Sequence, residues 1–483
     1  MKGTKLALLV GVAIVATGAK KAEKLPSPQA ITAKDRDYGA KAHPQLVAEF
    51  GGAYEGPQAD YVRRVGQKIA VQSGLSNTQS DFTVTLLNSS VDNAFAVPGG
   101  YVYVTRQLLA LMNDEAELAS VMGHEVGHVA ARHSQSRQKR ATTGALGQVL
   151  ATVLGGVIGG DTGARIGQQL GGSIAQNYVL SFSRSQEYQA DDLGVSYLGK
   201  AGYDPLAASS MLNSLAQETS LTRRLTGGKE VPVRESTHPD PASRVTRAAQ
   251  KASGTAAIAK VRNRDVFLNA IDGMLYDDDP KQGVIDGQAF RHPELKIAFT
   301  APAGYALVNT PQAVIIQGTG GRAQFTGAAH NGDLRTYVAA VFKAVGGQTS
   351  LEYGPIERGS INGIDTARAT ALANTQSGQV LVTVQAYEMS PTSAFHFVTI
   401  TPPNNPGLFA PLFQSFRRLT TAEASAIKPR RVDVVVAKSG DTVASLSARM
   451  AYADYREDRF RTLNALRTSD VIRAGQRYKL IVY

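Results

Sequence analysis

The chain has 483 residues, 43% of them hydrophobic and 19% charged, which suits two to four folded units and excludes disordered and collagen-like proteins. The absence of cysteine excludes disulfides, thiolate metal sites and cysteine nucleophiles. Lysine and arginine total 51 against 40 aspartates and glutamates, and this net charge of +11 favours anionic neighbours such as lipid headgroups or cell-wall polymers. No nucleic acid partner is expected, because the sequence has no tryptophan and no dense basic run with interleaved aromatic residues.

Residues 1–19 are predicted to be a secretory signal peptide. Lys2 and Lys5 precede an apolar run that ends in small residues, as signal peptidase sites do. The run is shorter than the roughly 20 residues of a membrane-spanning helix, although an uncleaved anchor and a buried N-terminal helix stay open as alternatives. Residues 20–40 are polar, contain two prolines and are predicted to be a linker. The protein is therefore expected to be exported to the periplasm or cell envelope.

The rest of the sequence predicts a multidomain protein. Residues 41–255 alternate periodic helical stretches with one short strand region, which predicts a mainly α domain with a small β-sheet. A glycine- and aspartate-rich passage at 272–283 marks a boundary. Residues 284–420 contain strand-like alternating runs and a helix-like end, which predicts an α+β domain of unknown role. Residues 432–483 are predicted to form a last, small α+β unit.

The segment Glu115–His133 carries the chemistry. Its apolar residues recur at helical spacing, so it is predicted to be a helix. His124 and His128 stand four positions apart on one face, where both imidazoles can reach one metal ion, and Glu125 projects beside them. This His-Glu-x-x-His pattern is the zincin signature. A pair of histidines that is merely solvated or satisfied in a core is the alternative.

Two glycines, Gly123 and Gly127, lie in the middle of this predicted helix. Each costs about 1 kcal/mol of helix stability relative to alanine. Their presence beside the His-Glu pair indicates close approach of another backbone or of a substrate.

A catalytic zinc ion keeps three protein ligands, so a third donor must come from elsewhere. Glu187 and Asp191 again stand four positions apart in a helical pattern, with two carboxylates on one face. One can bind the metal while the other orients a ligand imidazole. A carboxylate pair on a solvated helix face is the alternative.

Together these motifs resemble a known family. His124-Glu125-x-x-His128, followed by Glu187-x-x-Ala190-Asp191, resembles the gluzincin zinc metallopeptidases that include the prenyl-protein endopeptidases, the Oma-type proteases and the periplasmic β-barrel-assembly-enhancing protease. The segment Asn93–Leu109 is similar to the strand and following helix that precede the metal-binding helix of the family. A downstream His-Pro...Arg element matches as well, and the resemblance covers roughly residues 40–250.

The resemblance implies a zincin-type fold and a set of roles. The implied ligands of one zinc ion per chain are His124, His128 and Glu187, and Asp191 would hydrogen-bond a ligand histidine. Glu125 would be the general base and then the acid. The His-Pro...Arg element implies two more site residues, His238 and Arg244. His238 could stabilise the oxyanion or occupy the fourth zinc position as a latency switch, and Arg244 could position it.

Other features are expected to play supporting roles. The edge strand in Asn93–Val104 would hold an extended peptide by backbone pairing. The apolar stretch 144–160 is predicted to be a helix that packs over the site or dips into a membrane surface, with basic residues before it at Arg132, Arg137, Lys139 and Arg140. The remaining histidines are expected in surface or core roles rather than as metal ligands: His43, His133, His292, His330 and His396.

Residues 432–483 resemble a LysM-like module. The order is strand, Gly440-Asp441-Thr442, helix, a Leu-Asn element and a final strand, although the long spacing and the segment 451–460 depart from the pattern. The resemblance and an excess of basic residues imply peptidoglycan or an anionic surface as a partner. A structural appendage that packs on the protease is the alternative.

The sequence therefore predicts a zinc-dependent endopeptidase that hydrolyses peptide bonds in misfolded or unassembled cell-envelope proteins, with unfolded protein as its substrate. A latent or non-catalytic chaperone or wall-binding scaffold is the alternative. A structural zinc protein is disfavoured, because three ligands leave the shell open unless His238 closes it.

Overall fold

The computed structural model describes residues 30–133, 182–225, 238, 241–254, 261–346, 350–375 and 378–483. The predicted signal peptide, the apolar segment 144–160 and the basic residues Arg137, Lys139 and Arg140 lie outside the described residues. Among the helices that the structure describes, none is both long enough and apolar enough to cross a membrane.

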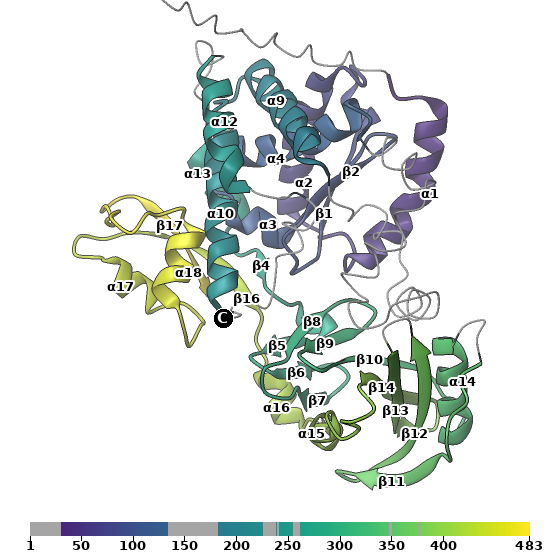
Figure 1. Cartoon of the computed structure of the whole chain (residues 1–483). Coiled ribbons are helices and arrows are strands. Elements are labelled where there is room, and N and C mark those ends of the chain that lie inside the picture. The colour runs from purple at the N-terminus through teal and green to yellow at the C-terminus, as the bar shows by residue number, and fades with distance from the viewer. Residues whose placement is uncertain are drawn as a thin grey trace, which may run out of the picture.

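The N-terminal region is helical around one small sheet (Figure 1). Its helices are α1 (Ala33–Glu49), α2 (Pro57–Ala70), α3 (Arg106–Leu111), α4 (Glu115–Ala130), α9 (Arg184–Ala201), α10 (Ala207–Leu225), α12 (Pro241–Ser253) and α13 (Arg264–Ile271), with short 3-10 turns at Val71–Ser73 and Gln79–Asp81. Its strands are β1 (Thr83–Leu87), β2 (Ala94–Val97) and β3 (Tyr101–Thr105), and β4 (Leu275–Tyr276) follows α13.

Helix α1 begins earlier than the sequence analysis predicts. Thr32 accepts a hydrogen bond from the backbone of Asp35, whose carboxylate accepts from the backbone of Thr32, and this reciprocal cap starts the helix at Ala33. The prediction of a linker over residues 20–40 is therefore wrong for residues 33–40.

The three-stranded sheet has the order β1-β3-β2, with β1 parallel and β2 antiparallel to β3. The segment Asn93–Val104 thus contributes β2 and most of β3, which are joined by a tight turn. Of these two strands, β3 lies in the middle of the sheet and β2 lies at an edge. The edge strand packs beside α4, which carries the His-Glu-x-x-His residues. An extended peptide laid along β2 would therefore run next to these residues.

Helices α4 and α9 cross at close range through small residues. A Cβ atom on Gly123 would lie 3.5 Å from the Cα atom of Gly194, and one on Gly127 would lie 3.2 Å from the carbonyl oxygen of Ala190. The close approach predicted at Gly123 and Gly127 is thus confirmed, and the neighbour is the backbone of α9.

Residues 277–429 form a β-rich region with one covering helix, which lies below the helical part in Figure 1. One sheet has seven strands in the order β11-β12-β13-β14-β10-β9-β8, and the other has four in the order β15-β7-β6-β5. The strands are β5 (Val284–Asp286), β6 (Ala289–His292), β7 (Ile297–Thr300), β8 (Ala306–Asn309), β9 (Val314–Gly318), β10 (Gly321–Ala329), β11 (Glu357–Ile361), β12 (Ile364–Thr375), β13 (Gly378–Ser390), β14 (Ser393–Thr401) and β15 (Arg417–Arg418). The helices are α14 (Leu334–Gly346), α15 (Ala410–Ser415) and α16 (Thr421–Ala426), with a 3-10 turn at Pro280–Gln282.

The C-terminal segment returns to the helical region. It consists of β16 (Arg430–Val436), α17 (Val443–Ser447), α18 (Arg456–Leu463) and β17 (Arg477–Val482). Strand β16 pairs with β17 on one side and with β4 on the other, and α18 packs on α10 (Figure 1). Val432, Phe460 and Leu480 belong to the same buried cluster as the core of the helical region. The segment has two helices between its strands, one more than the sequence analysis expects. It shares a core with the helical region, which agrees with the alternative of a structural appendage that packs on that region.

Candidate metal centre

Three helices, α4, α9 and α12, and one loop residue, His238, bring the predicted site together. Asp114 caps α4 by accepting from the backbone of Glu117, which fixes the start of the helix that carries both histidines. Ser183 caps α9 with Gln186 in the same reciprocal way as Thr32 caps α1. The carboxylates of α9 then face the imidazoles of α4 across the glycine contact.

The predicted ligand atoms converge on one point. Nε2 of His124 lies 3.0 Å from Nε2 of His128, and the Glu187 carboxylate lies 3.5 Å from the first and 3.4 Å from the second. With His238, these ligand atoms all lie within 4.8 Å of one another. Zinc–nitrogen bonds of about 2.0–2.1 Å set tetrahedral donors about 3.3 Å apart. The donor set and its spacing therefore fit one zinc ion.

His238 lies inside this cluster and is 4% exposed. Its Nδ1 atom is 3.0 Å from the Glu187 carboxylate and 3.4 Å from Nε2 of His124, while its Nε2 atom is 3.7 Å from the carboxylate of Glu125. The ring is thus within reach of both the ligand atoms and the carboxylate of the expected base. Both roles proposed for it from the sequence are compatible with this position.

Arg244 on α12 holds the two carboxylates of α9 rather than His238. Its guanidinium donates to both oxygens of Asp191 at 2.8 and 2.5 Å and pairs with Glu187 at 2.5 Å. The other partner of Asp191 is Nδ1 of His124, at 2.9 Å. Asp191 therefore lies between the imidazole of His124 and the guanidinium of Arg244, where its carboxylate can orient that imidazole.

The charges of this cluster are set by mutual pairing. Burial disfavours the charged form of His124, but hydrogen bonds to Asp191 and Glu187 outweigh it and raise the pKa of His124 to about 9. Burial likewise opposes ionisation of both carboxylates, but His238 and the ligand histidines for Glu187, and Arg244 for Asp191, hold each pKa well below its usual range. Both carboxylates are thus ionised at neutral pH. His124 has to lose its proton to serve as a ligand, so metal binding releases a proton.

Three residues near the centre were missed in the sequence. His133 is buried, and its Nδ1 atom lies 2.9 Å from Nδ1 of His128. Its Nε2 atom lies 2.7 Å from Oε1 of Gln189 on α9. The ring of Phe182 stacks on His128 at a centroid distance of 3.7 Å. His133 was expected to play a surface or core role, and its spacing from His128 is not a ligand spacing.

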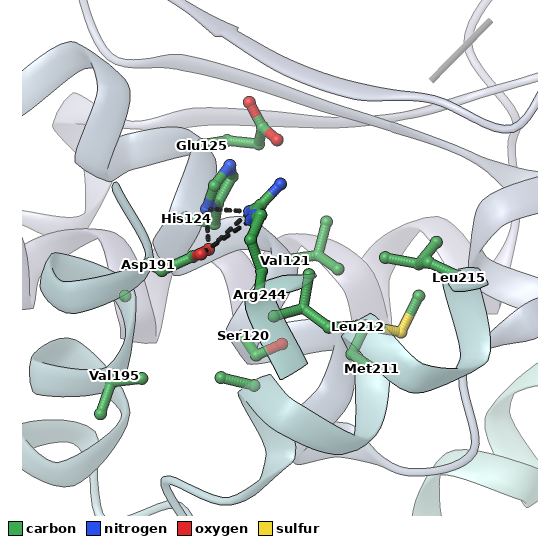
Figure 2. A pocket seen from close by; sticks show the side chains of 12 residues that line it. Ser120, Val121, His124, Glu125, Asp191, Val195, Met211, Leu212, Leu215 and Arg244 are labelled. Carbon is green, nitrogen blue, oxygen red and sulfur yellow. Dashed lines mark hydrogen bonds and ion pairs between the residues drawn. The ribbon is translucent and has the colours of Figure 1, made fainter. Parts of the chain in front are cut away.

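A small hollow of about 40 Å³ lies beside the site between α4, α9 and α10. Figure 2 shows Val121, Met211, Leu212 and Leu215 on one side of Arg244 and Val195 on the other, while the carboxylate of Glu125 points away from the Arg244–Asp191 pair. The aliphatic lining consists of Val121, Val195, Ala208, Met211, Leu212 and Leu215. Apolar surface thus lies directly beside the charged centre.

Comparisons with known proteins agree on this part of the chain. Residues 57–252 match the family described as Peptidase family M48. The chain is 30% identical over 216 residues to the Beta-barrel assembly-enhancing protease of Yersinia pestis, which covers 43% of this chain and 42% of that protein. It is 29% identical over 211 residues to the Mitochondrial metalloendopeptidase OMA1 of Schizosaccharomyces pombe, covering 43% and 57%. It is 28% identical over 230 residues to the Metalloprotease YcaL of Escherichia coli, covering 45% and 87%.

The chain spans about two fifths of the length of the Yersinia protein and somewhat more than half of the Schizosaccharomyces protein. The match ends before the β-rich region and the C-terminal segment begin. The similarity therefore concerns the helical region that carries the metal-binding cluster.

Proposed function

We propose that residues 57–252, which match the family described as Peptidase family M48, form a metallopeptidase domain and that the chain is a zinc-dependent endopeptidase. The observation that carries the proposal is the convergence of His124, His128 and Glu187 on one point, with Glu125 beside them. These three residues would hold the ion. Asp191 and Arg244 would keep the first histidine and the carboxylate in place.

The residues of the chain supply the proton transfers. When bound, zinc polarises the scissile carbonyl and lowers the pKa of the attacking water toward about 7. Glu125 is the proposed base: a carboxylate oxygen takes the proton of the attacking water and then delivers it to the leaving amine. Glu125 is 4% exposed, and a buried carboxylate transfers protons without competition from bulk water.

The proposed substrates are misfolded or unassembled proteins of the cell envelope. Strand β2 supports this, because an edge strand binds an extended peptide through its backbone and so accepts many sequences. The predicted signal peptide and the net charge of +11 agree with an exported protein near anionic surfaces. One relative is named for enhancing β-barrel assembly, which is an envelope process.

We further propose that residues 432–483 contribute to an anionic membrane surface or peptidoglycan contact. Arg449 and Arg473 are among the basic side chains of this segment. Because the segment shares a core with the peptidase helices, any such contact would be rigidly connected to the metal centre.

A latent or non-catalytic scaffold is the second candidate, and His238 is the observation that favours it. A ring nitrogen 3.0 Å from Glu187 and 3.4 Å from His124 can complete a closed shell of four ligands. A closed shell would hold zinc without leaving a position for substrate.

The test compares the mature protein with its Glu125→Gln variant on an unfolded protein substrate, with and without a chelator. Cleavage by the parent alone, abolished by chelation, is the expected result. Glu125→Gln should still bind one zinc ion, because Glu125 is not among the proposed ligands. Zinc binding without cleavage by the parent would favour the latent scaffold, and absence of zinc binding would refute the proposed metal site.

A further inference from the structure

His124 and His128 are held by different kinds of partner. Nδ1 of His124 faces the carboxylate of Asp191, the common arrangement for a metal-binding histidine. Nδ1 of His128 faces a second imidazole, that of His133, where Nδ1 of His124 has a carboxylate. The two ligands thus depend on different elements of the fold.

The chain turns sharply to bring His133 back to the helix. Arg132 has a φ of 54°, in the left-handed region, directly after α4 ends at Ala130. This turn brings the His133 ring to a centroid distance of 5.0 Å from His128, nearly perpendicular to it. The side chain is 4% exposed, so water does not compete for its nitrogens.

The contacts allow one arrangement of protons. Nε2 of His128 lies on the ligand side, 3.0 Å from Nε2 of His124, and must keep its lone pair to bind a metal. Its proton is then on Nδ1, which donates to Nδ1 of His133 at 2.9 Å. The proton of His133 is therefore on Nε2, which donates to Oε1 of Gln189 at 2.7 Å. In both hydrogen bonds, His128 to His133 and His133 to Gln189, a protonated nitrogen thus faces an acceptor atom.

We propose that His133 and Gln189 form a hydrogen-bonded relay that fixes the tautomer and the orientation of His128 as a zinc ligand. Gln189 stands on α9, two residues after Glu187, so the relay connects α9 to His128 by a route separate from the Glu187 carboxylate. The ring of Phe182 stacks on the His128 ring at a centroid distance of 3.7 Å and restricts its rotation. His133 is a positioning residue: it acts through His128 and touches no reacting atom.

The inference rests on the proposed function, and its readout is zinc affinity rather than cleavage. The full chain and its variants would be titrated with zinc against a chromophoric chelator at neutral pH. His133→Leu removes the acceptor at similar size, and we expect zinc affinity to fall 10–100-fold, the usual effect of losing such a partner. His133→Asn keeps an oxygen near the position of Nδ1 and should stay within about threefold of the parent.

The matched control is His43→Leu. His43 is also an imidazole of the helical region with one short contact, to the hydroxyl of Tyr103 at 2.8 Å, but it lies on α1 away from the metal centre. This variant should bind zinc as the parent does. Thermal unfolding of each variant, measured after a chelator has removed bound metal, shows whether its fold is intact.

Two outcomes would overturn the relay. Equal zinc affinity of His133→Leu and the parent would show that the contact does nothing for His128, and equal losses in the Leu and Asn variants would reduce His133 to packing. If the Leu variant does not fold, Gln189→Leu against Gln189→Glu decides, because only the glutamate keeps an acceptor for Nε2. A parent that binds no zinc refutes the proposed function, whereas a parent that binds zinc with an unaffected variant refutes the relay alone.

Discussion

The ammonium nitrogen of Lys479 lies 2.7 Å from the carbonyl oxygen of Ala110, which is 369 positions earlier in the chain. It also donates to the carbonyl oxygen of Met112 at 2.5 Å. The side chain is fully buried, and burial holds the pKa of Lys479 well below its usual range. These carbonyls end α3 just before Asp114 caps α4. Lys479 therefore binds β17 to the turn between α3 and α4, from which the helix with both histidines starts.

Replacing this lysine should destabilise the helical region. Lys479→Met keeps the length of the side chain but leaves two buried carbonyls without a donor, which we expect to lower the unfolding free energy by about 2 kcal/mol. Denaturant unfolding of the full chain measures it. Lys438→Met, at an exposed lysine before α17, is the control and should change stability little. Equal stability of the two variants would contradict a structural role for the buried ammonium.

Arg244 compensates two buried carboxylates, and its removal should be costly. Arg244→Gln leaves Asp191 and Glu187 ionised without their guanidinium, and breaking a buried pair in this way costs about 3–5 kcal/mol. Thermal unfolding of the chelated protein should show a clear loss. The control is Arg247→Gln, one turn along α12, whose pair with Asp192 is partly exposed and should contribute little. Similar losses in both variants would argue against the special position of Arg244.

His238 should restrain the resting enzyme if it completes the metal shell. Its position 3.0 Å from Glu187 leads us to expect that His238→Ala cleaves an unfolded substrate several-fold faster than the parent and binds zinc less tightly. Initial rates and chelator competition check both. A fall in kcat of about a hundredfold or more with unchanged zinc affinity would instead assign His238 to oxyanion stabilisation.

The β-rich region should lose stability in acid through His396. This imidazole is 7% exposed beneath α14, and burial lowers the pKa of His396 to about 4. Between pH 6.5 and 4 the unfolded chain binds a proton that the folded chain does not, so the stabilisation is full above pH 6.5 and falls by about 3 kcal/mol toward pH 4. His396→Leu should flatten this pH slope relative to the parent.

Tyr337→Phe is the matched control for this titration. It removes the hydroxyl that lies 2.8 Å from Nδ1 of His396 but keeps the imidazole buried, so the pH slope should remain. Asp278 titrates in the opposite sense, because burial raises the pKa of Asp278 to about 6, and taking differences between variant and parent cancels its effect. Parallel slopes in His396→Leu and the parent would exclude His396 as the source.

Local spacing accounts for what the sequence predicts about the site. Residues four positions apart on a helix share a face whatever the tertiary structure, so the pairs His124–His128 and Glu187–Asp191 could be paired from spacing alone. That the two pairs meet was inferred from the need of a catalytic zinc ion for a third ligand and from the resemblance. Gly123 and Gly127 gave a second signal, because glycines in the middle of a helix indicate that another group approaches the helix closely.

What the sequence did not predict depends on backbone turns and long-range contacts. His133 reaches His128 because Arg132 adopts a left-handed conformation, which is uncommon outside glycine and has no signature in the residue type. From the sequence, Lys479 is an ordinary polar residue in a predicted strand, whereas in the structure it donates to the carbonyl oxygen of Ala110, 369 positions earlier. The C-terminal segment was predicted as a separate unit for the same reason: nothing local shows that Leu480 completes the core of another region.

Strands β4 and β16 are neighbours in one sheet although residues 277–429 separate them in the sequence. A nascent chain that has emerged to residue 276 already contains every residue of the proposed metal centre but lacks the side chains of β16, α18 and β17 that complete the core. Contacts between segments so distant in sequence form slowly, since the intervening loop must close first. We therefore expect the core around the proposed metal centre to be completed late, after synthesis has passed residue 482, so that the proposed peptidase activity would arise only once the chain itself has folded.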